Sequence, residues 1–446
     1  MKKIFKILLI INSVYSQSYS LDNCINIAIE SKKTILSASL GVTSAEKGLA
    51  GSYSNFLPTI SFNSNSTRTN FPDRTSISGI NLNLNELSVD TSYNTVDHYN
   101  NFSTGLSLNQ TLYNGGRNVN QVRQARLSLE IAELNKRLIK IQVIQKVINS
   151  YYNLLKAQKL YDVAIKNLEM SEQQVGLVEK QFNLGVVRKT DLLKANVAQG
   201  QAKVDLLNKK TSLENSRRVL FNDMGLQDFG QEILVSEKKW VVRDIPSTSD
   251  LLAQIKEKNP NLLLSEKQTQ LRNYNYELIR GTRLPSINSS INYSSNSQEL
   301  NTIPDAIKND WSLGLNFSLS IPIYTGNSLL MQQQQAKISI DQAKLTYITL
   351  LNDLRVQAEL IRESLDNYSE IIPINNEVVF SAEEDLKLVR ERYSLGSSTI
   401  LEVLDAQISL FRSNSTLINS IHNARIQEAN LKAIIGSLDL EYKEDK

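Results

Sequence analysis

The clearest pattern along the chain is a strict alternation of apolar and polar residues that begins at Trp311. Every odd position is apolar and the residues between are Ser, Gly, Asn or Pro, the apolar series being Trp311, Leu313, Leu315, Phe317, Leu319, Ile321 and Ile323. Successive side chains of a β-strand point to opposite faces, so a period of two indicates a strand. The segment 311–324 is therefore predicted to be a strand with one apolar and one polar face.

Three other segments alternate less completely and are predicted to be strands, over about 57–66, 102–113 and 284–293. The second of them alternates leucines with small polar residues: Leu106, Ser107, Leu108, Asn109, Thr111 and Leu112. The stretch Thr67–Asn101 is rich in Asn, Ser, Thr and Asp. Such a composition is typical of loops, so we expect an exposed loop there.

Long helical hairpins are predicted from apolar residues spaced three and four apart, as at Leu127 and Ile131. No proline interrupts residues 73 to 245. The first hairpin is expected over 115–223, and its outgoing helix would be roughly 100 Å long at 1.5 Å per residue. Gly185 is expected to end that helix, since glycine is the usual residue just past a helix C-terminus.

The chain contains an internal duplication. The two motifs that end the outgoing helices are 211 residues apart (396 − 185), and the two motifs that begin those helices are also 211 residues apart. The two motifs that begin the first strand of each repeat are 227 residues apart (284 − 57). These pairs are Phe182–Gly185 with Tyr393–Gly396, Leu112–Gly115 with Ile323–Gly326, and Leu57–Ile60 with Leu284–Ile287. The predicted order is a signal peptide 1–20, a first repeat 21–226, a joining segment 227–249, a second repeat 250–438 and a short tail 439–446.

The second repeat is expected to follow the plan of the first. A helical stretch is predicted over Asp250–Arg280, as over Leu21–Ser52 in the first repeat. Its hairpin is expected over 326–436, with a turn at Gly396. Pro373 lies inside the outgoing helix and is expected to kink it, because proline removes a backbone hydrogen bond.

The N-terminus is typical of an export signal. Lysines at positions 2, 3 and 6 precede an apolar run over 7–11, and Ser16, Ser18 and Ser20 offer cleavage points. The run is much shorter than the roughly 20 residues that a membrane-spanning helix needs. The alternative is a buried N-terminal helix.

Composition disfavours several classes of function. The 49 Lys and Arg residues nearly balance 46 Asp and Glu, which argues against a nucleic-acid partner. The chain has only two histidines and one cysteine, which disfavours a metal site or a histidine-dependent catalytic centre. Neither His98 nor His422 has a plausible nucleophile or second ligand nearby in sequence. We therefore expect no enzyme, cofactor or metal. Cys24 lacks the small residues that precede a lipidation site and is predicted to be an unpaired, packed thiol.

Four strands in one chain indicate assembly if they enter a membrane. An open sheet has two unpaired edges, which lipid does not tolerate, and transmembrane barrels of this kind have eight or more strands. Several chains would then have to share one barrel. A soluble sheet with one wet face is the alternative for any single strand, and a cytosolic coiled-coil scaffold is the alternative for the helices.

Taken together, these motifs resemble the TolC family of outer-membrane factors over essentially the whole mature chain. The resemblance rests on the Leu-Pro pairs at the strand entries, the Tyr-x-Gly junctions, the two Leu-Gly turns and the sequence Thr399–Ala406. It implies an α+β membrane protein, a homotrimer whose twelve strands close an antiparallel β-barrel in outer-membrane lipid. A long α-helical coiled-coil barrel continues it through the periplasm. The implied partners are a periplasmic adaptor and an inner-membrane efflux or secretion pump.

The resemblance also assigns residues. Glu402 and Asp405 match acidic positions of the family that form constricting rings at the periplasmic mouth. Without the resemblance, two acidic residues three apart would be taken only to favour a helix start. Gate contacts are expected at Thr190, Asp191 and Tyr393. The family's usual arginine is replaced by Ser398, and Arg188 does not align with it. Adaptor contacts are expected at the tips, which are also ordinary capping turns: Leu184, Gly185, Val186, Leu395 and Gly396.

Two functions remain open from sequence alone. The first is a gated export channel at the outer membrane, and the second is a structural periplasmic coiled-coil protein without transport. The alternation after Trp311 and the tip carboxylates favour the first. The cargo, whether drug, metal or protein, is not encoded in any motif.

Overall fold

The computed structural model describes residues 18–83, 88–227, 234–235 and 246–442. Residues 1–17 of the predicted signal peptide, most of the joining segment and the last four residues lie outside these ranges. The chain forms two compact units. One comprises 1–43, 131–267 and 344–446, and the other comprises 44–130 and 268–343.

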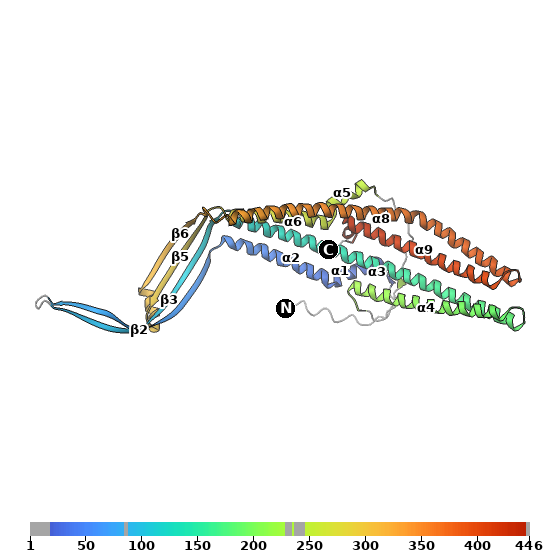
Figure 1. Cartoon of the computed structure of the whole chain (residues 1–446), viewed down its shortest axis with the longest axis horizontal. Helices are drawn as coiled ribbons and strands as arrows, with labels where there is room; N and C mark the ends of the chain where they lie inside the picture. The colour runs from blue at the N-terminus through green and yellow to red at the C-terminus, as the bar shows by residue number, and fades with distance from the viewer. Residues whose placement is uncertain (1–17, 84–87, 228–233, 236–245, 443–446) are drawn as a thin grey trace. The chain divides into compact units, whose positions relative to one another are not determined.

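The second unit holds a four-stranded antiparallel sheet in the order β2-β3-β5-β6 (Figure 1). Its strands are β2 (Thr59–Asn83), β3 (Ser88–Asn114), β5 (Ser286–Ser297) and β6 (Trp311–Ser320). The short helices η2 (Leu300–Thr302) and α7 (Ile303–Asn309) connect β5 to β6, and η1 (Tyr53–Phe56) precedes β2.

The predicted loop over Thr67–Asn101 is wrong, because most of it is strand. β2 and β3 stay paired beyond the reach of β5, with Thr67 opposite Asn101 and Thr75 opposite Thr95. The ladder is made by backbone groups, so a polar composition does not prevent it, and the threonines of this stretch favour strand. At the other end, β6 stops at Ser320 rather than near 324, since Pro322 cannot donate to a ladder.

The register gives the sheet one apolar and one polar face. Ile60, Leu108, Ile291 and Leu315 lie side by side in one row across the four strands. The apolar side chains of β6 are exposed in the single chain, Leu315 by 63% and Phe317 by 64%. Directly opposed and diagonal neighbours support one another on this face, where the ring of Tyr293 stacks on Trp311 with centroids 5.7 Å apart.

The helices repeat in length as well as in order. The outgoing helices α3 (Arg117–Asn183) and α8 (Ser328–Ser394) both have 67 residues, and the return helices α4 (Lys189–Met224) and α9 (Ile400–Ile435) both have 36. α8 continues through Pro373 as one helix. The two hairpins run alongside each other in Figure 1. The sequence therefore encodes the same hairpin twice.

Each predicted N-terminal helical stretch is broken in two. The first forms α1 (Leu21–Ser31) and α2 (Lys33–Ser52), and the second forms α5 (Thr248–Lys258) and α6 (Pro260–Gly281). The break residues, Lys32 and Asn259, have nearly the same extended backbone, with ψ 117° in both. Pro260 explains the second break, because a residue before proline avoids the helical region.

The glycines that end the return helices pack against the two helix breaks. Gly225 lies against Ser31 and Lys32, and Gly436 lies against Lys258 and Asn259, each with a positive φ. Side-chain hydrogen bonds reinforce both contacts. The Lys32 ammonium donates to the Asn222 carbonyl at 2.5 Å, and the Asn259 amide donates to the Ile434 carbonyl at 2.6 Å. Each repeat is thus closed by the same packing device, which motif spacing alone did not reveal.

The core of the first unit surrounds α1. Cys24 and Ile25 are fully buried with Ile144, Val147 and Met224. Cys24 is free, so the prediction of a packed, unpaired thiol is confirmed. Burial raises the pKa of this thiol to about 12, which leaves it protonated and unreactive at neutral pH.

The end of α9 is held by one arginine of α3. Arg137 donates to the Asp439 carboxylate at 2.9 Å and to the Gly436 carbonyl at 2.7 Å. The pair is largely buried, with 27% and 11% of the side chains exposed. A short helix, η3 (Leu438–Leu440), is thereby fixed to the outgoing helix.

The glycine contacts generate a graded stability prediction. A Cβ on Gly436 would lie 2.3 Å from the Lys258 carbonyl oxygen, whereas one on Gly225 would lie 3.3 Å from Ser31. Gly436→Ala should therefore destabilise the fold by about 2–4 kcal/mol, and Gly225→Ala by about 1–2 kcal/mol from the positive φ. Gly41→Ala, inside α2 with open space around it, should be neutral or stabilising by up to about 1 kcal/mol. Thermal unfolding followed by circular dichroism would give the ranking, and an equal loss at both cap glycines would contradict it.

Candidate functional site at the hairpin turns

Both hairpins turn by the same backbone device. Gly185 and Gly396 take left-handed conformations with φ of 77° and 75°. The next residue closes each turn, as Val186 donates to the Gln181 carbonyl and Ser397 to the Arg392 carbonyl, both at 2.9 Å. These bonds satisfy carbonyls that a helix end leaves open. The two turns lie at the same end of the first unit in Figure 1.

The turns present apolar side chains to solvent. Leu184 is 79% exposed, Val186 69% and Leu395 82%. Leucine and valine side chains that are this exposed contribute little to the packing of this chain. Grouped apolar exposure of this kind is typical of a contact surface.

Immediately behind the turns, an apolar cluster joins the two hairpins. It is formed by residues of all four long helices, including Val178, Ala195, Leu386, Ile400 and Val403. Val178 and Val403 are fully buried. The turns of this chain are therefore held as a pair.

Glu402 lies at the start of α9 and forms a capping box with Thr399. The Thr399 hydroxyl accepts from the Glu402 backbone at 3.3 Å, and the Glu402 carboxylate accepts from the Thr399 backbone at 3.3 Å. The Ser398 hydroxyl also donates to this carboxylate, at 2.7 Å. The spacing Thr399-x-x-Glu402 is the sequence signature of such a box, and it was the signal that the sequence analysis missed.

These bonds change the acidity of Glu402. Hydrogen bonds from Ser398 and then Thr399 hold the pKa of its carboxyl below the ordinary value, and the Arg392 guanidinium, 3.7 Å away, acts in the same direction. Arg392 also donates to the Ser397 carbonyl at 3.4 Å. The cation at this turn therefore comes from α8, while Ser398 serves the carboxylate as a neutral donor.

Asp405 follows Glu402 by three residues on α9. Residues three apart lie on the same side of a helix, so both carboxylates share one face near the turn. Both side chains are exposed. Glu402 bends back onto its own helix start, whereas Asp405 lies one turn further along, beyond the capping box.

Two of the expected gate residues, Tyr393 and Asp191, lie near each other in space within one chain. Tyr393 is 7% exposed, and its hydroxyl donates to the Gln181 amide oxygen of α3 at 2.9 Å. Burial raises the pKa of this phenol, and the charge of Asp191 raises it further. Thr190, next to Asp191, is exposed. A bond from Tyr393 to Asp191 of a neighbouring hairpin stays a prediction.

A buried polar layer lies behind the apolar cluster. Gln407 of α9 is 3% exposed, and its amide nitrogen donates to the Ser171 hydroxyl at 2.8 Å and the Asn167 side chain at 3.0 Å. Buried polar groups in a coiled-coil seam fix the register of the helices at a cost in stability. Gln407 was not singled out from the sequence, because one glutamine on a mixed helix has no distinguishing pattern.

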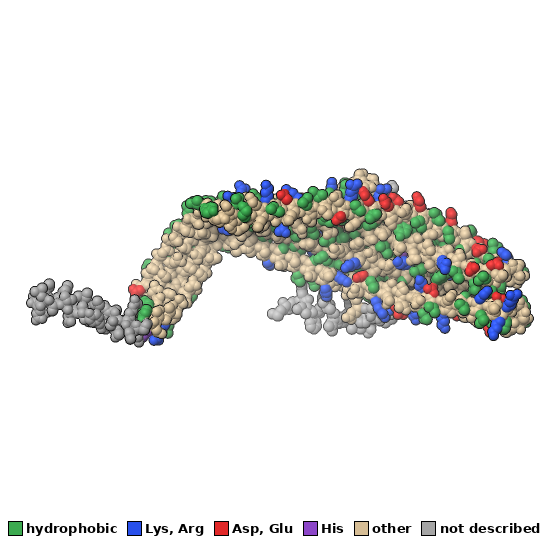
Figure 2. All heavy atoms as spheres, in the orientation of Figure 1, with side chains coloured by type: hydrophobic (Ala, Val, Ile, Leu, Met, Phe, Trp, Pro, Cys, Tyr) green, Lys and Arg blue, Asp and Glu red, His purple; other side chains and the backbone are tan. Residues whose placement is uncertain are grey.

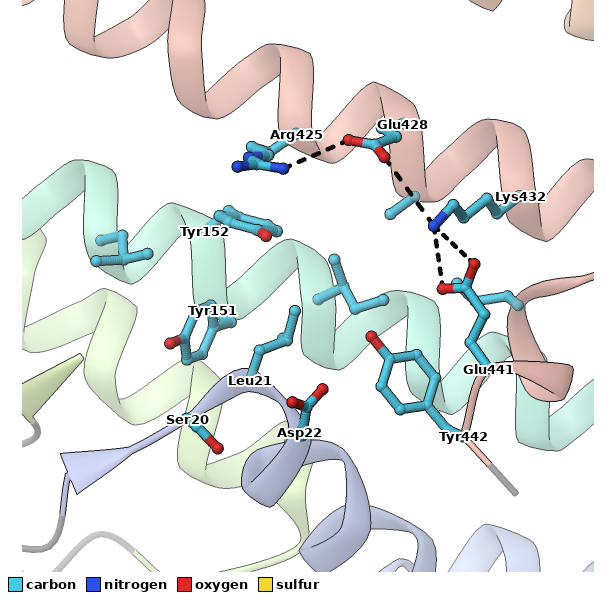
Figure 3. Close-up of a pocket in the computed structure, with 14 residues that line it drawn as sticks. Ser20, Leu21, Asp22, Tyr151, Tyr152, Arg425, Glu428, Lys432, Glu441 and Tyr442 are labelled. Carbon is cyan, nitrogen blue, oxygen red and sulfur yellow. Dashed lines mark hydrogen bonds and ion pairs between the residues drawn. The ribbon is translucent and has the colours of Figure 1, made fainter. Parts of the chain in front are cut away.

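A cavity of about 420 Å³ lies apart from the turns, between α1, α3 and the end of α9 (Figure 3). Ion pairs bridge one wall, where the Lys432 ammonium contacts Glu441 at 2.8 Å and Glu428 at 4.0 Å. Arg425 contacts Glu428 at 3.6 Å. Figure 3 shows Tyr442 beside Glu441, and Asp22 on α1 across from α9. The Lys432–Glu441 pair ties the C-terminal segment to α9, which is a structural role.

Within the described parts of the chain, no group of three or more His, Cys, Asp and Glu side chains is placed to hold a metal ion. Among the helices described, none is long and apolar enough to cross a membrane.

Comparisons with known proteins give a consistent result. The family model described as outer membrane efflux protein matches residues 24–226 and 251–437, and so covers both repeats. Outer membrane protein TolC of Vibrio cholerae is 25% identical over 352 residues, which are 75% of this chain and 77% of that protein. The cation efflux system protein CusC of Escherichia coli K12 is 24% identical over 343 residues, 75% of this chain and 73% of that protein.

Solved structures share the fold. A crystal structure of CusC superposes with a TM-score of 0.79 at 20% identity, covering 96% of this chain and 95% of that one. The open-state MtrE outer membrane channel of Neisseria gonorrhoeae superposes with a TM-score of 0.76 at 20% identity, covering 94% and 89%. The predicted fold class, a β-barrel sheet continued by a helical barrel, is confirmed.

The capping box generates a pH prediction. Because the folded pKa of Glu402 is depressed, its stabilising contribution is present above the unfolded value near 4.5 and is lost as pH falls through the folded pKa. Glu402→Gln should therefore lower the melting temperature at pH 7, and the difference from the wild type should shrink toward pH 3. Asp405→Asn removes the same charge without touching the box and serves as control. A difference that persists unchanged at low pH would show that the carboxylate is not the stabilising group.

Proposed function

Because the chain belongs to the outer membrane efflux protein family, we propose that it is the outer-membrane channel of a tripartite efflux or type I secretion system. Three copies close one barrel of twelve strands in lipid, and their hairpins close a tunnel through the periplasm. A periplasmic adaptor and an inner-membrane pump complete the pathway. The observation that carries this proposal is the four-stranded sheet with two open edges and an uncovered apolar face.

The edges of the sheet call for further copies of the chain. β2 and β6 lie at the two edges, so each offers a row of unpaired backbone groups. A closed barrel is the arrangement that satisfies such edges in lipid. Pairing β6 of one copy with β2 of the next continues the same antiparallel ladder until three copies close the ring.

The apolar face of the sheet suits a lipid environment. Leu313, Leu315, Phe317 and Leu319 are each more than 60% exposed in the single chain. Burying each of them in hydrocarbon contributes on the order of 1–2 kcal/mol. Trp311 and Tyr293 stack at one end of this face, where aromatic rings are favoured at a membrane interface.

The helices also have uncovered apolar stripes. On α4, Leu193, Val197, Val204 and Leu207 are each more than half exposed. α8 has a comparable series that includes Ile338, Leu345, Ile348, Val356 and Leu360. Such stripes on long helices are the seams of coiled coils. Neighbouring copies in the trimer would cover them.

The hairpin turns form the periplasmic mouth in this proposal. Three copies each of Glu402 and Asp405 place carboxylates around the opening, which favours cations there. Tyr393, Asp191 and Thr190 hold neighbouring hairpins in the closed state. The exposed Leu184, Val186 and Leu395, with Gly185 and Gly396, receive the adaptor. The structural coiled-coil alternative draws no support from the relatives, which are efflux proteins.

Single-channel current across a planar bilayer tests the proposal. The wild type is expected to give discrete steps that prefer cations, because the tip carboxylates attract them. The double variant Glu402→Gln/Asp405→Asn should conduct with that preference reduced, since it keeps the size of both side chains and removes their charge. Folded protein that inserts without conducting, in both forms, would contradict a channel.

A further inference from the structure

The polar face of the sheet is uncharged over its four-stranded part. Ser61, Ser107, Asn292 and Gly314 form one row across the strands, and Asn316 lies in the next row opposite Ser290. Every residue that the register places on this face there is Ser, Asn, Thr or Gly. In Figure 2 the strands are tan between their ends, without the blue and red of charged side chains.

The polar side chains of this face bond to one another. The hydroxyls of Ser61 and Ser107 lie 2.7 Å apart, and those of Ser294 and Ser312 lie 2.9 Å apart. The Thr111 hydroxyl donates to the Asn288 amide oxygen at 3.1 Å. The face therefore offers short hydroxyls and amides that hydrogen-bond with each other and with water. It has no side chain that would bind a charged group or an apolar surface of a solute.

This face is also hollowed at the end of the sheet nearest η1. A groove of about 660 Å³ is lined there by Asn109, Asn288, Asn316 and Thr59. Its other walls include Leu57 and Pro58, which also have no charge. A solute that passes along the four-stranded part of the sheet thus meets neutral, hydrogen-bonding groups from the groove to the end of the β5–β6 ladder.

We infer that the barrel formed by this sheet is an electroneutral exit that passes cargo without regard to its charge. The inference rests on the proposed trimeric channel, because closure with the apolar face toward lipid turns the neutral face toward the lumen. Selection between ions needs fixed charges close to their path. The tip carboxylates act only locally, since α8 alone is about 100 Å long and the Debye length is about 10 Å at 0.1 M salt. Cations, anions and neutral solutes should therefore pass the four-stranded part of the barrel equally well.

Introduced charges at Asn316 test the inference in the double variant Glu402→Gln/Asp405→Asn. This background removes the tip carboxylates, and its ratio of potassium to chloride permeability is the baseline for charges added in the sheet. Adding Asn316→Asp should raise the ratio by about twofold or more at low salt, and Asn316→Lys should lower it by a similar factor. Asn316→Ser, which keeps the site neutral and small, should leave it unchanged. Reversal potentials in a potassium chloride gradient give each ratio.

Charging the site after assembly avoids variants that fail to insert. Asn316→Cys in a Cys24→Ala background can be modified in the open bilayer with a negatively or a positively charged thiol reagent. Opposite shifts of the reversal potential support a neutral wall at Asn316 that faces the lumen. Identical responses to both reagents would overturn the inference, as would permeability ratios that Asn316→Asp and Asn316→Lys leave at the baseline. A wild type that carries no current would instead refute the channel itself.

Discussion

Lipid does not accept an open edge of a β-sheet, and the rest of this structure depends on that constraint. Each unpaired backbone group in hydrocarbon costs several kcal/mol, and β2 and β6 each offer a full row of them. One chain supplies four strands, whereas a closed barrel needs at least eight. A chain whose sheet lies in lipid would therefore require copies of itself. In the proposed assembly, the exposed apolar stripes on α4 and α8 would be the surfaces along which those copies meet.

The internal duplication supplies parts that can repeat around a ring. α3 matches α8 and α4 matches α9 in length, and the glycine ends of both return helices pack into equivalent helix breaks. The repeats differ at their turns. The second has the Thr399–Glu402 capping box and the Arg392 contact, whereas Arg188, at the start of α4, makes no side-chain cap bond. The first hairpin has Asp191 in the first turn of α4, at the position equivalent to Glu402, but only Glu402 belongs to a capping box.

Much of the fold could be predicted because its strongest signals are periodic. The alternation from Trp311 identified β6, and the two Leu-Gly motifs identified the turns. Three features were not predicted from the sequence. The β2–β3 extension has a loop-like composition and is held by backbone pairing, the break at Lys32 depends on packing against Gly225, and the layer at Gln407 depends on which residues face it across the seam. At the turns, the residue types suggested the carboxylates, but their hydrogen-bond partners required coordinates, apart from the Thr399-x-x-Glu402 signature that was present and overlooked.

Disulfide cross-linking between the sheet edges tests most directly whether three chains share one barrel. In a Cys24→Ala background, a cysteine at Asn63 of β2 would be combined with single cysteines at Ser312, Gly314, Asn316 or Ser318 of β6. A disulfide forms only where Cα atoms approach within about 4.4–6.8 Å. The account predicts that one register yields linked chains on a non-reducing gel, in a ladder that ends at three. Chains that stay unlinked in every register, or a ladder that continues beyond three, would contradict it.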